Sequence, residues 1–329
     1  MPVPIQAGTV LRTRYQIKQV IGQGGMGCIY LAEDLRLEGR QCAVKEVEYD
    51  RALPEAMLNE ARNQFQREAT VLARLDHPNL PKVSDFFSIH DRDYLVMDYV
   101  PGKDLRQLMI EARQGQSFLP EEDVLNWASQ IADALRYLHT QETPILHRDI
   151  KPSNLKLTPN GLVKLVDFGL VKVLAPGEVT ITILQGQGTA LYTPLEQYGG
   201  DSGHTDARSD IYALGGTLYH LLTNEPPLNV RDRFLNPGTL PPVRTINPDV
   251  STRTERAINW ALQLHPEDRP KDIEAFVKAL FLEDAPVTKT FRGDRRLQPR
   301  LIRTPEKILL YLAGSLTVIS LLLTLIRNF

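Results

Sequence analysis

The sequence predicts an α+β fold with two lobes, a small lobe rich in β-strands and a larger helical lobe, followed by an apolar helix near the C-terminus. Strand-like alternation of apolar and polar residues is common between residues 15 and 99, whereas apolar residues recur at helical spacing after residue 104. The chain has 329 residues and 42% hydrophobic residues, enough for one large domain or two lobes with a core. Residues 308–326 contain no charged side chain.

The overall composition excludes some classes of partner and site. The 38 basic and 40 acidic residues nearly balance, so no nucleic-acid partner is expected. The two cysteines, Cys28 and Cys42, lack the spacing of a metal site, and such sparing use suits a reducing cytosol. The N-terminal residues lack a cationic patch followed by an apolar run, so no secretory signal is expected.

Residues 1–14 form a short lead, and the first strands follow from Tyr15. Alternation up to Ile21 predicts one strand, and Ile29 to Leu31 predict the next. The intervening GQGGMG carries glycines that let backbone N–H groups approach phosphate oxygens without a Cβ in the way. A dinucleotide-binding loop would require a helix directly after the glycines, and the strand pattern argues against that alternative.

A lysine and a glutamate stand out in the next two elements. The strand Cys42–Lys45 ends in a lysine that, taken alone, would simply reach water. Residues 54–75 are rich in Ala, Leu, Glu, Arg and Gln and therefore predict a helix. Its apolar face passes through Phe65 and Leu72, and Glu68 lies beside that face and points inward.

Further strands and a long helix surround the most informative stretch. Residues 83–89 and 94–99 predict strands joined by a polar turn. Residues 121–140 place apolar side chains at intervals of three and four, which predicts a buried supporting helix. Residues 155–166 contain the turn signal Pro-Asn-Gly between apolar runs and predict a hairpin.

The stretch HRDIKPSNLKLTPNGLVKLVDFG, at residues 147–169, combines side chains suited to phosphoryl transfer. Asp149 can accept the proton of an attacking hydroxyl, and Lys151 would place a positive charge beside the transferring group. Asn154 and Asp167 offer the oxygen ligands that Mg²⁺ prefers. The alternative is that these polar residues merely close surface turns.

The sequence HRD-x-x-x-x-N followed by DFG resembles the catalytic and metal-binding loops of the protein kinase family, with Ile150 in place of the usual leucine. The lysine in HRDIKPSN resembles serine/threonine kinases rather than tyrosine kinases. The resemblance covers residues 15–282 and implies a small lobe at 15–97, a hinge at 98–103 and a helical lobe at 104–282.

The resemblance also implies ATP and Mg²⁺ as cofactors. Lys45 would contact the α- and β-phosphates, and Glu68 would pair with Lys45. Glu55 and Glu60 belong to the same helix but fall too early in the sequence to be that partner.

Two segments would hold the nucleotide. Backbone groups of Asp98 and Val100 would hydrogen-bond adenine, and Asp104 would either reach the ribose or cap a helix. The glycine-rich loop would cover the phosphates with Ile21, Gly22, Gln23, Gly24, Gly25, Met26, Gly27, Cys28 and Ile29.

Residues 170–196 resemble the activation loop of this family and are longer than a compact domain usually retains without a function. Thr180 and Thr182 are the candidates for regulatory phosphorylation, and Arg148 would bind the added phosphate. Thr189 would line the substrate site.

One departure from the family pattern falls at Pro194-Leu195-Glu196, where A-P-E is usual. The glutamate is kept, and Arg269 matches the arginine that pairs with it, so the change affects the local backbone without removing a chemical group. Asp210 would hold the catalytic loop from below, or would simply favour the start of its own helix. Helices at 252–264 and 271–281 complete the domain.

The tail changes character. Residues 283–307 resemble a flexible basic linker that would also touch anionic lipid headgroups, and Ile308–Ile326 predicts a transmembrane helix. At about 1.5 Å per residue this helix matches the ~30 Å hydrocarbon core. The excess of cations before it predicts a single-pass protein of the cell membrane with a cytoplasmic kinase domain, and no external sensor domain is expected. A terminal helix packed on the domain is the alternative, although apolar residues cover all its faces.

We therefore expect a tail-anchored bacterial-type serine/threonine protein kinase that moves the γ-phosphate of ATP to protein hydroxyls and phosphorylates its own activation loop. A pseudokinase serving as a scaffold at the membrane is the first alternative, but every catalytic group is present. A kinase of small molecules is the second, and Lys151 with the long activation loop favours protein substrates. A homodimer is compatible with the sequence.

Overall fold

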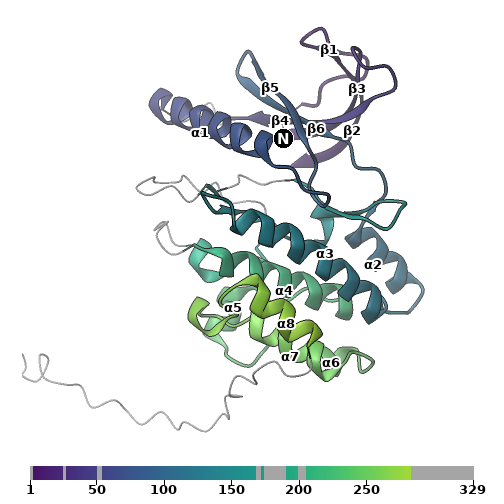
Figure 1. Ribbon diagram of the computed structural model, residues 1–329, viewed down its shortest axis with the longest axis vertical. Helices are drawn as coiled ribbons and strands as arrows, with labels where there is room; N and C mark the ends of the chain where they lie inside the picture. The colour runs from purple at the N-terminus through teal and green to yellow at the C-terminus, as the bar shows by residue number, and fades with distance from the viewer. Residues whose placement is uncertain are drawn as a thin grey trace, which may run out of the picture. The chain divides into compact units, whose positions relative to one another are not determined.

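The computed structural model describes residues 3–24, 27–49, 54–167, 172–173, 190–198 and 205–282. Figure 1 shows a lobe of strands with one long helix, joined to a lobe of helices. The expected linker and the Ile308–Ile326 helix lie outside the described residues, as do Gly25, Met26, Thr180, Thr182 and Thr189. Within the described ranges, no helix is both long enough and apolar enough to cross a bilayer.

The small lobe is built on one six-stranded antiparallel sheet in the order β1-β2-β3-β4-β6-β5. Buried side chains lie on both faces of its central strands, so burial there does not follow strict alternation. The strands are β1 (Val10–Leu11), β2 (Tyr15–Gly24), β3 (Gly27–Asp34), β4 (Gln41–Glu48), β5 (Val83–Ile89) and β6 (Arg92–Asp98).

The expected lead at residues 1–14 takes part in this sheet. Its strand β1 pairs with β2, and the backbone N–H of Ile5 donates to the hydroxyl of Tyr30 at 3.0 Å. Leu11 is buried in a second apolar cluster on the sheet, together with Tyr15 and Tyr30. The segment is therefore structural, because it covers apolar side chains that a short lead would leave in water.

The sheet packs against helix α1 (Glu55–Arg74), as the pattern at 54–75 predicts. Phe65 and Leu72 are buried on the helix, and Phe65 contacts the ring of Phe86 on β5 with ring centroids 5.5 Å apart. Glu68 is buried on the same face, which confirms its inward orientation. The helix therefore holds a carboxylate inside the small lobe.

The second lobe is mainly helical. Its helices are α2 (Leu105–Gln114), α3 (Glu121–His139), α4 (Ala207–Thr223), α5 (Val230–Leu235), α6 (Val243–Ile246), α7 (Thr252–Ala261) and α8 (Ile273–Phe281), with 3₁₀ turns η1 (Pro152–Asn154), η2 (Leu195–Gln197) and η4 (Pro266–Asp268). Short strands β7 (Lys103–Asp104), β9 (Leu155–Leu157) and β10 (Val163–Leu165) form one sheet, and β8 (Ile145–Leu146) pairs with β11 (Lys172–Val173).

Some expected boundaries differ from these helices. Asp210 lies inside the first turn of α4, because Asp206 caps that helix by accepting from the N–H of Arg208 at 2.9 Å. Helix α7 ends at Ala261 rather than at Leu264. The apolar residues after Ala261 belong to the turn into η4, so their spacing extends the helical pattern beyond the helix.

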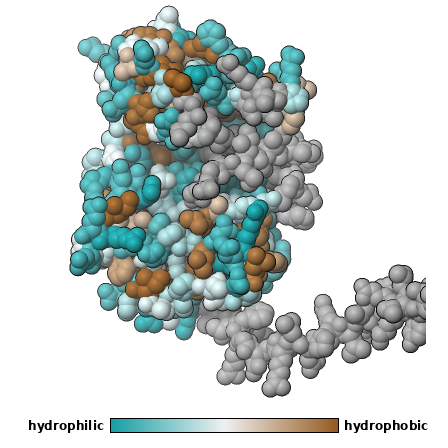
Figure 2. Space-filling view, turned by 180° about the vertical axis from the view of Figure 1, so that it is seen from behind, coloured by the Kyte–Doolittle hydropathy of each residue, from teal (hydrophilic) through white to brown (hydrophobic). Residues whose placement is uncertain are grey.

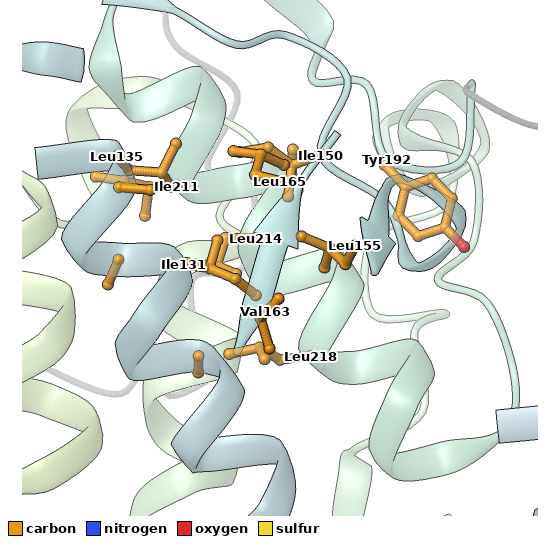
Figure 3. Packing of buried hydrophobic residues seen from close by; sticks show 14 of the residues in the cluster. Ile131, Leu135, Ile150, Leu155, Val163, Leu165, Tyr192, Ile211, Leu214 and Leu218 are labelled. Carbon is orange, nitrogen blue, oxygen red and sulfur yellow. The ribbon is translucent and has the colours of Figure 1, made fainter. Parts of the chain in front are cut away.

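The core of this lobe supports the predicted hairpin, β9–β10. Figure 3 shows its aliphatic side chains next to those of α3 and α4. Ile150, which follows the expected catalytic aspartate, is buried in the same cluster. The labelled members are Ile131 and Leu135 from α3, Ile211, Leu214 and Leu218 from α4, and Ile150, Leu155, Val163 and Leu165. The apolar packing thus fixes Ile150 and the β9–β10 hairpin, and with them the chain next to Asp149 and Asp167.

Polar side chains dominate much of the outer surface. Figure 2 shows one face, on which apolar patches are interspersed among hydrophilic residues. Large exposed apolar side chains include Phe234 and Leu235 at the end of α5. Most other large apolar residues are in the two buried clusters, as expected for a folded domain.

Candidate active site

The loop before β9 is held from below by Asp210. Its two carboxylate oxygens accept the backbone N–H groups of His147 at 2.9 Å and Arg148 at 2.8 Å. His139 contributes a third hydrogen bond at 2.9 Å. Burial would raise the pKa of Asp210, but these hydrogen bonds and the nearby histidines hold it below its ordinary value. Asp210 thus fixes a loop in which Arg148 has a φ of 64°.

Asp149 is the central carboxylate of the site and is only 4% exposed. Lys151 donates to its Oδ2 at 2.9 Å, and the Asn154 amide donates to the same oxygen at 2.9 Å. Burial raises the pKa of Asp149, and the charge of Lys151 opposes that rise. The carboxylate is consequently fixed in one orientation by two neighbours of the same loop.

The second acid, Asp167, lies next to this loop at the end of the hairpin. The backbone N–H of Val166 donates to the carbonyl of Asn154 at 2.8 Å, which brings the two expected metal ligands together. Asp167 has a φ of 57°. Its carboxylate pairs with Lys45 of β4. Burial would raise the pKa of Asp167, but Lys45 outweighs that effect and lowers it.

The expected ion pair between Lys45 and Glu68 is not formed in this structure. Among the described residues, no ion pair joins these two side chains, and Lys45 binds Asp167 instead. Glu68 accepts a hydrogen bond from Gln64 at 3.1 Å. Burial raises the pKa of Glu68 to about 7, with Gln64, Arg148 and Lys45 opposing the rise. Burial thus favours the protonated form of Glu68, which attracts Lys45 less than the ionised Asp167 does.

The strands on either side of the glycine-rich segment pair with each other, as expected. Gln23 lies opposite Cys28, and Gly24 lies opposite Gly27, across β2 and β3. A Cβ on Gly27 would lie 1.9 Å from the carbonyl oxygen of Glu46, so only glycine fits there. Gly27 therefore keeps the start of β3 close to the backbone of β4.

The backbone groups of the hinge differ in whether they form hydrogen bonds with other described residues. The N–H of Asp98 donates to the carbonyl of Lys82 at 2.9 Å. No hydrogen bond joins the backbone of Val100 to another described residue. Asp104 caps α2, because its carboxylate accepts from the N–H of Gln107 at 2.9 Å in a reciprocal capping box. The helix-cap alternative for Asp104 is thus confirmed.

A buried ion pair anchors the segment at residues 190–198. Arg269 donates to both oxygens of Glu196, at 2.6 and 3.1 Å, and Ser209 donates to the first oxygen at 2.7 Å. The expected pairing of Glu196 with Arg269 is therefore present despite the altered Pro194-Leu195-Glu196 sequence. The carboxylate accepts hydrogen bonds from two directions, which fixes η2.

Sequence reasoning missed one polar contact near the site. The hydroxyl of Tyr192 lies 2.5 Å from Nδ1 of His220 on α4. Nothing in the local pattern links these residues, since they lie in separate elements. Their only signal was the position of Tyr192 in the segment GTALYTP, close to the expected substrate-lining Thr189.

Comparisons with known proteins agree with this geometry. The protein kinase domain family matches residues 15–282. The chain is 42% identical over 219 residues to Probable serine/threonine-protein kinase SCO3848 of Streptomyces coelicolor, covering 65% of this chain and 31% of that protein. It is 35% identical over 295 residues to Serine/threonine-protein kinase PrkC of Bacillus subtilis, covering 86% of this chain and 43% of that protein. The chain thus spans less than half the length of either relative.

A solved structure shows the same fold. The PknI kinase domain of Mycobacterium tuberculosis matches with a TM-score of 0.63 and 29% identity. The match covers 84% of this chain and 98% of that one. With the family match across both lobes, this similarity identifies the chain as a member of the protein kinase family.

Proposed function

We propose that the chain is a serine/threonine protein kinase that transfers the γ-phosphate of ATP to hydroxyls of proteins. The observation that carries the proposal is the arrangement around Asp149. Its buried carboxylate is oriented by Lys151 and Asn154, and Asn154 is tied to the strand that ends at Asp167. Such an arrangement joins a proton acceptor, a cation and two oxygen ligands in one place.

The chain offers groups that fit the nucleotide. The backbone of Val100, which bonds to no other described residue, and the carbonyl of Asp98 would hydrogen-bond adenine. Lys45 would bind the α- and β-phosphates, and Glu68 would hold Lys45 in that position. The backbone of the glycine-rich loop would cover the phosphates, with Ile21, Gly22, Gln23, Gly24, Gly25, Met26, Gly27, Cys28 and Ile29.

Asn154 and Asp167 fit Mg²⁺ because amide and carboxylate oxygens are its preferred ligands. Among the described residues, no cluster of three or more histidine, cysteine or acidic side chains would hold a metal by itself. Magnesium in such a site would share its coordination with nucleotide oxygens and water, as it commonly does.

ATP with Mg²⁺, when bound, supplies the phosphoryl group and neutralises its charge. Asp149 would orient the substrate hydroxyl and take its proton as the bond from that oxygen to the γ-phosphorus forms and the bond from phosphorus to the departing ADP oxygen breaks. Lys151 steadies the γ-phosphate beside Asp149, where it already lies 2.9 Å from that carboxylate. Asp210 acts only by holding the backbone of the loop in place.

The test is transfer of labelled phosphate from ATP with Mg²⁺ to a general protein substrate, run beside Asp149→Asn. We expect transfer by the wild type and a loss of about 10²–10⁴-fold in the variant, the usual contribution of a general base. Equal transfer by both proteins would contradict the role of Asp149. ATP binding without transfer would favour the scaffold alternative.

Regulation by phosphorylation of Thr180 and Thr182 is part of the proposal. Arg148, directly before Asp149, is half-buried, and its buried Nε has no hydrogen-bond partner among the described residues. Burial lowers the pKa of Arg148, so a phosphate nearby would stabilise its charged form. Phosphopeptide mapping of wild type and Asp149→Asn after incubation with ATP tests for this phosphorylation. Unmodified Thr180 and Thr182 in the wild type would contradict the proposal.

Membrane attachment through Ile308–Ile326 is also proposed, with the basic linker at 283–307 on the cytoplasmic side. The support is the uncharged length of the segment and the cations that precede it. Alkaline extraction of membranes should leave the full chain in the pellet. A chain truncated after Leu282 should be released, and equal release of both would count against the anchor.

A further inference from the structure

Two polar contacts link α4 to the catalytic loop and to residues 190–198. Thr217 on α4 donates to the carbonyl of Ile150 at 3.3 Å, directly after Asp149. About one helical turn further along α4, His220 meets the hydroxyl of Tyr192 at 2.5 Å. Figure 3 shows this hydroxyl pointing away from the labelled aliphatic side chains. Helix α4 thus contacts both the residue after Asp149 and Tyr192.

Helix α2 adds an exposed cation beside these contacts, on the hinge side. It packs against η1 of the catalytic loop and against α4. Arg106 lies in its first turn and is exposed. Helix α2 packs against the helix that carries His220, and the charge of Arg106 contributes to the lowered pKa of His220 and opposes the burial-induced rise in the pKa of Tyr192.

Arg106 differs from the other cations at this helix. Lys103 donates to Glu111 at 2.7 Å, and Arg113 lies 3.2 Å from Glu225. Arg106 forms no ion pair or hydrogen bond with any other described residue. The positive end of the helix dipole disfavours a cation in the first turn, so Arg106 does not stabilise its own helix. Its charge remains available to a ligand.

His220 contributes a hydrogen-bonding group rather than a charge. Burial, with smaller contributions from the charges of Arg106 and Arg113, lowers its pKa to about 4. The imidazole is therefore neutral at physiological pH and can hold the Tyr192 hydroxyl. The positive charge beside the Tyr192–His220 pair comes from Arg106.

We propose that Arg106, beside the Tyr192–His220 pair, forms a subsite that selects protein substrates with an acidic residue close to the acceptor hydroxyl. This inference rests on the proposed kinase activity and names the substrate class of that site. An unpaired guanidinium binds a carboxylate through charge-assisted hydrogen bonds. Tyr192 and His220 form the fixed wall against which the peptide backbone lies.

The test uses peptides with one threonine acceptor and either Asp or Lys at each of the flanking positions. Wild type should prefer Asp over Lys at one or two positions by about fivefold in kcat/KM, as expected for a partly exposed ion pair. Arg106→Gln should remove the preference. Arg106→Glu should reverse it in favour of Lys, an outcome that a purely structural role would not produce.

Arg256→Gln, an exposed arginine on α7, is the matched control and should retain the preference for Asp. The thermal midpoint and the KM for ATP identify any variant that is misfolded. If Arg106→Glu is misfolded, Arg106→Gln alone provides the test. Transfer to all peptides with no preference, or a preference unchanged in Arg106→Glu, would overturn the inference while leaving the proposed function intact. No transfer to any peptide or to a general protein substrate would overturn both.

Discussion

Lys45 is paired with Asp167, so that a cation of the small lobe meets the acid at the end of the β9–β10 hairpin. This pair leaves Glu68 buried without its expected partner. A buried carboxyl that lacks a paired cation favours its protonated form, and burial indeed raises the pKa of Glu68 to about 7. Nucleotide binding that drew Lys45 toward Glu68 would favour the ionised form instead.

Replacing Glu68 by glutamine should change how stability depends on pH. The folded pKa of about 7 lies above the model-peptide value of 4.5. Between these values the folded state keeps a proton that the unfolded state loses, so stability falls as pH rises. We expect wild type to lose roughly 3 kcal/mol relative to Glu68→Gln between pH 4 and pH 8. Urea unfolding at several pH values measures this.

Glu60→Gln provides the control, because it removes the same charge from an exposed position on α1, where Glu60 pairs with Arg67 at 2.8 Å. The free energy of unfolding of Glu60→Gln should follow the same pH dependence as that of wild type. If the free energies of unfolding of Glu68→Gln and wild type differed by a constant amount, the carboxyl would not be protonated in the folded state.

The sequence predicted most elements that surround the site. The hairpin, helix α1 and the inward position of Glu68 follow from local periodicity and turn chemistry, and all three are present. Helices α5 and α6 are too short to show a helical period, and β1 is too short to show alternation. These elements depend on packing rather than on local pattern.

Side-chain partners were harder to predict than elements. The pair of Glu196 with Arg269 followed from family resemblance and is present. Whether Lys45 pairs with Glu68 or with Asp167 depends on the positions and burial of these two carboxylates in the folded chain. No local sequence pattern encodes those positions. The contact of Tyr192 with His220 likewise joins segments far apart in the sequence.

Removing the cation beside Asp149 should shift the pH dependence of catalysis. Burial raises the pKa of Asp149 and Lys151 opposes that rise, so Lys151→Gln should raise the pKa further. Asp149 must be ionised to accept a proton, and the acid limb of kcat/KM should therefore move to higher pH. The maximum rate should also fall, by about 10²-fold. Lys156→Gln on β9 serves as the control, and an acid limb at the same pH in both variants would refute the assignment.

The hinge should tolerate no side chain at Gly102. Its φ is +109°, and a Cβ would lie 2.1 Å from the carbonyl oxygen of Leu157. Gly161 also has a positive φ, of +80°, but no atom lies within 4 Å of an added Cβ. Gly161→Ala should therefore cost only the backbone strain, about 1–2 kcal/mol. Gly102→Ala should cost clearly more and should weaken nucleotide binding, because the hinge must move away from β9. Equal losses in urea unfolding would contradict this account.

The anchor of the segment after the activation loop should be the most sensitive ion pair of the helical lobe. The side chain of Arg269 is 0% exposed and that of Glu196 is 6% exposed. Glu196→Ala would leave a buried guanidinium without its carboxylate and should lower the free energy of unfolding by about 3–5 kcal/mol.

Neighbouring groups supply the comparison. Glu267 pairs with Arg208 at 2.9 Å but is 84% exposed, so Glu267→Ala should cost less than about 1 kcal/mol. The double variant Glu196→Leu with Arg269→Met should recover part of the loss, because it leaves no unpaired charge in the core. Urea unfolding of the three variants measures these differences. A double variant less stable than Glu196→Ala would show that the carbonyl contacts of Arg269, at Gln263 and Leu264, matter more than its charge partner.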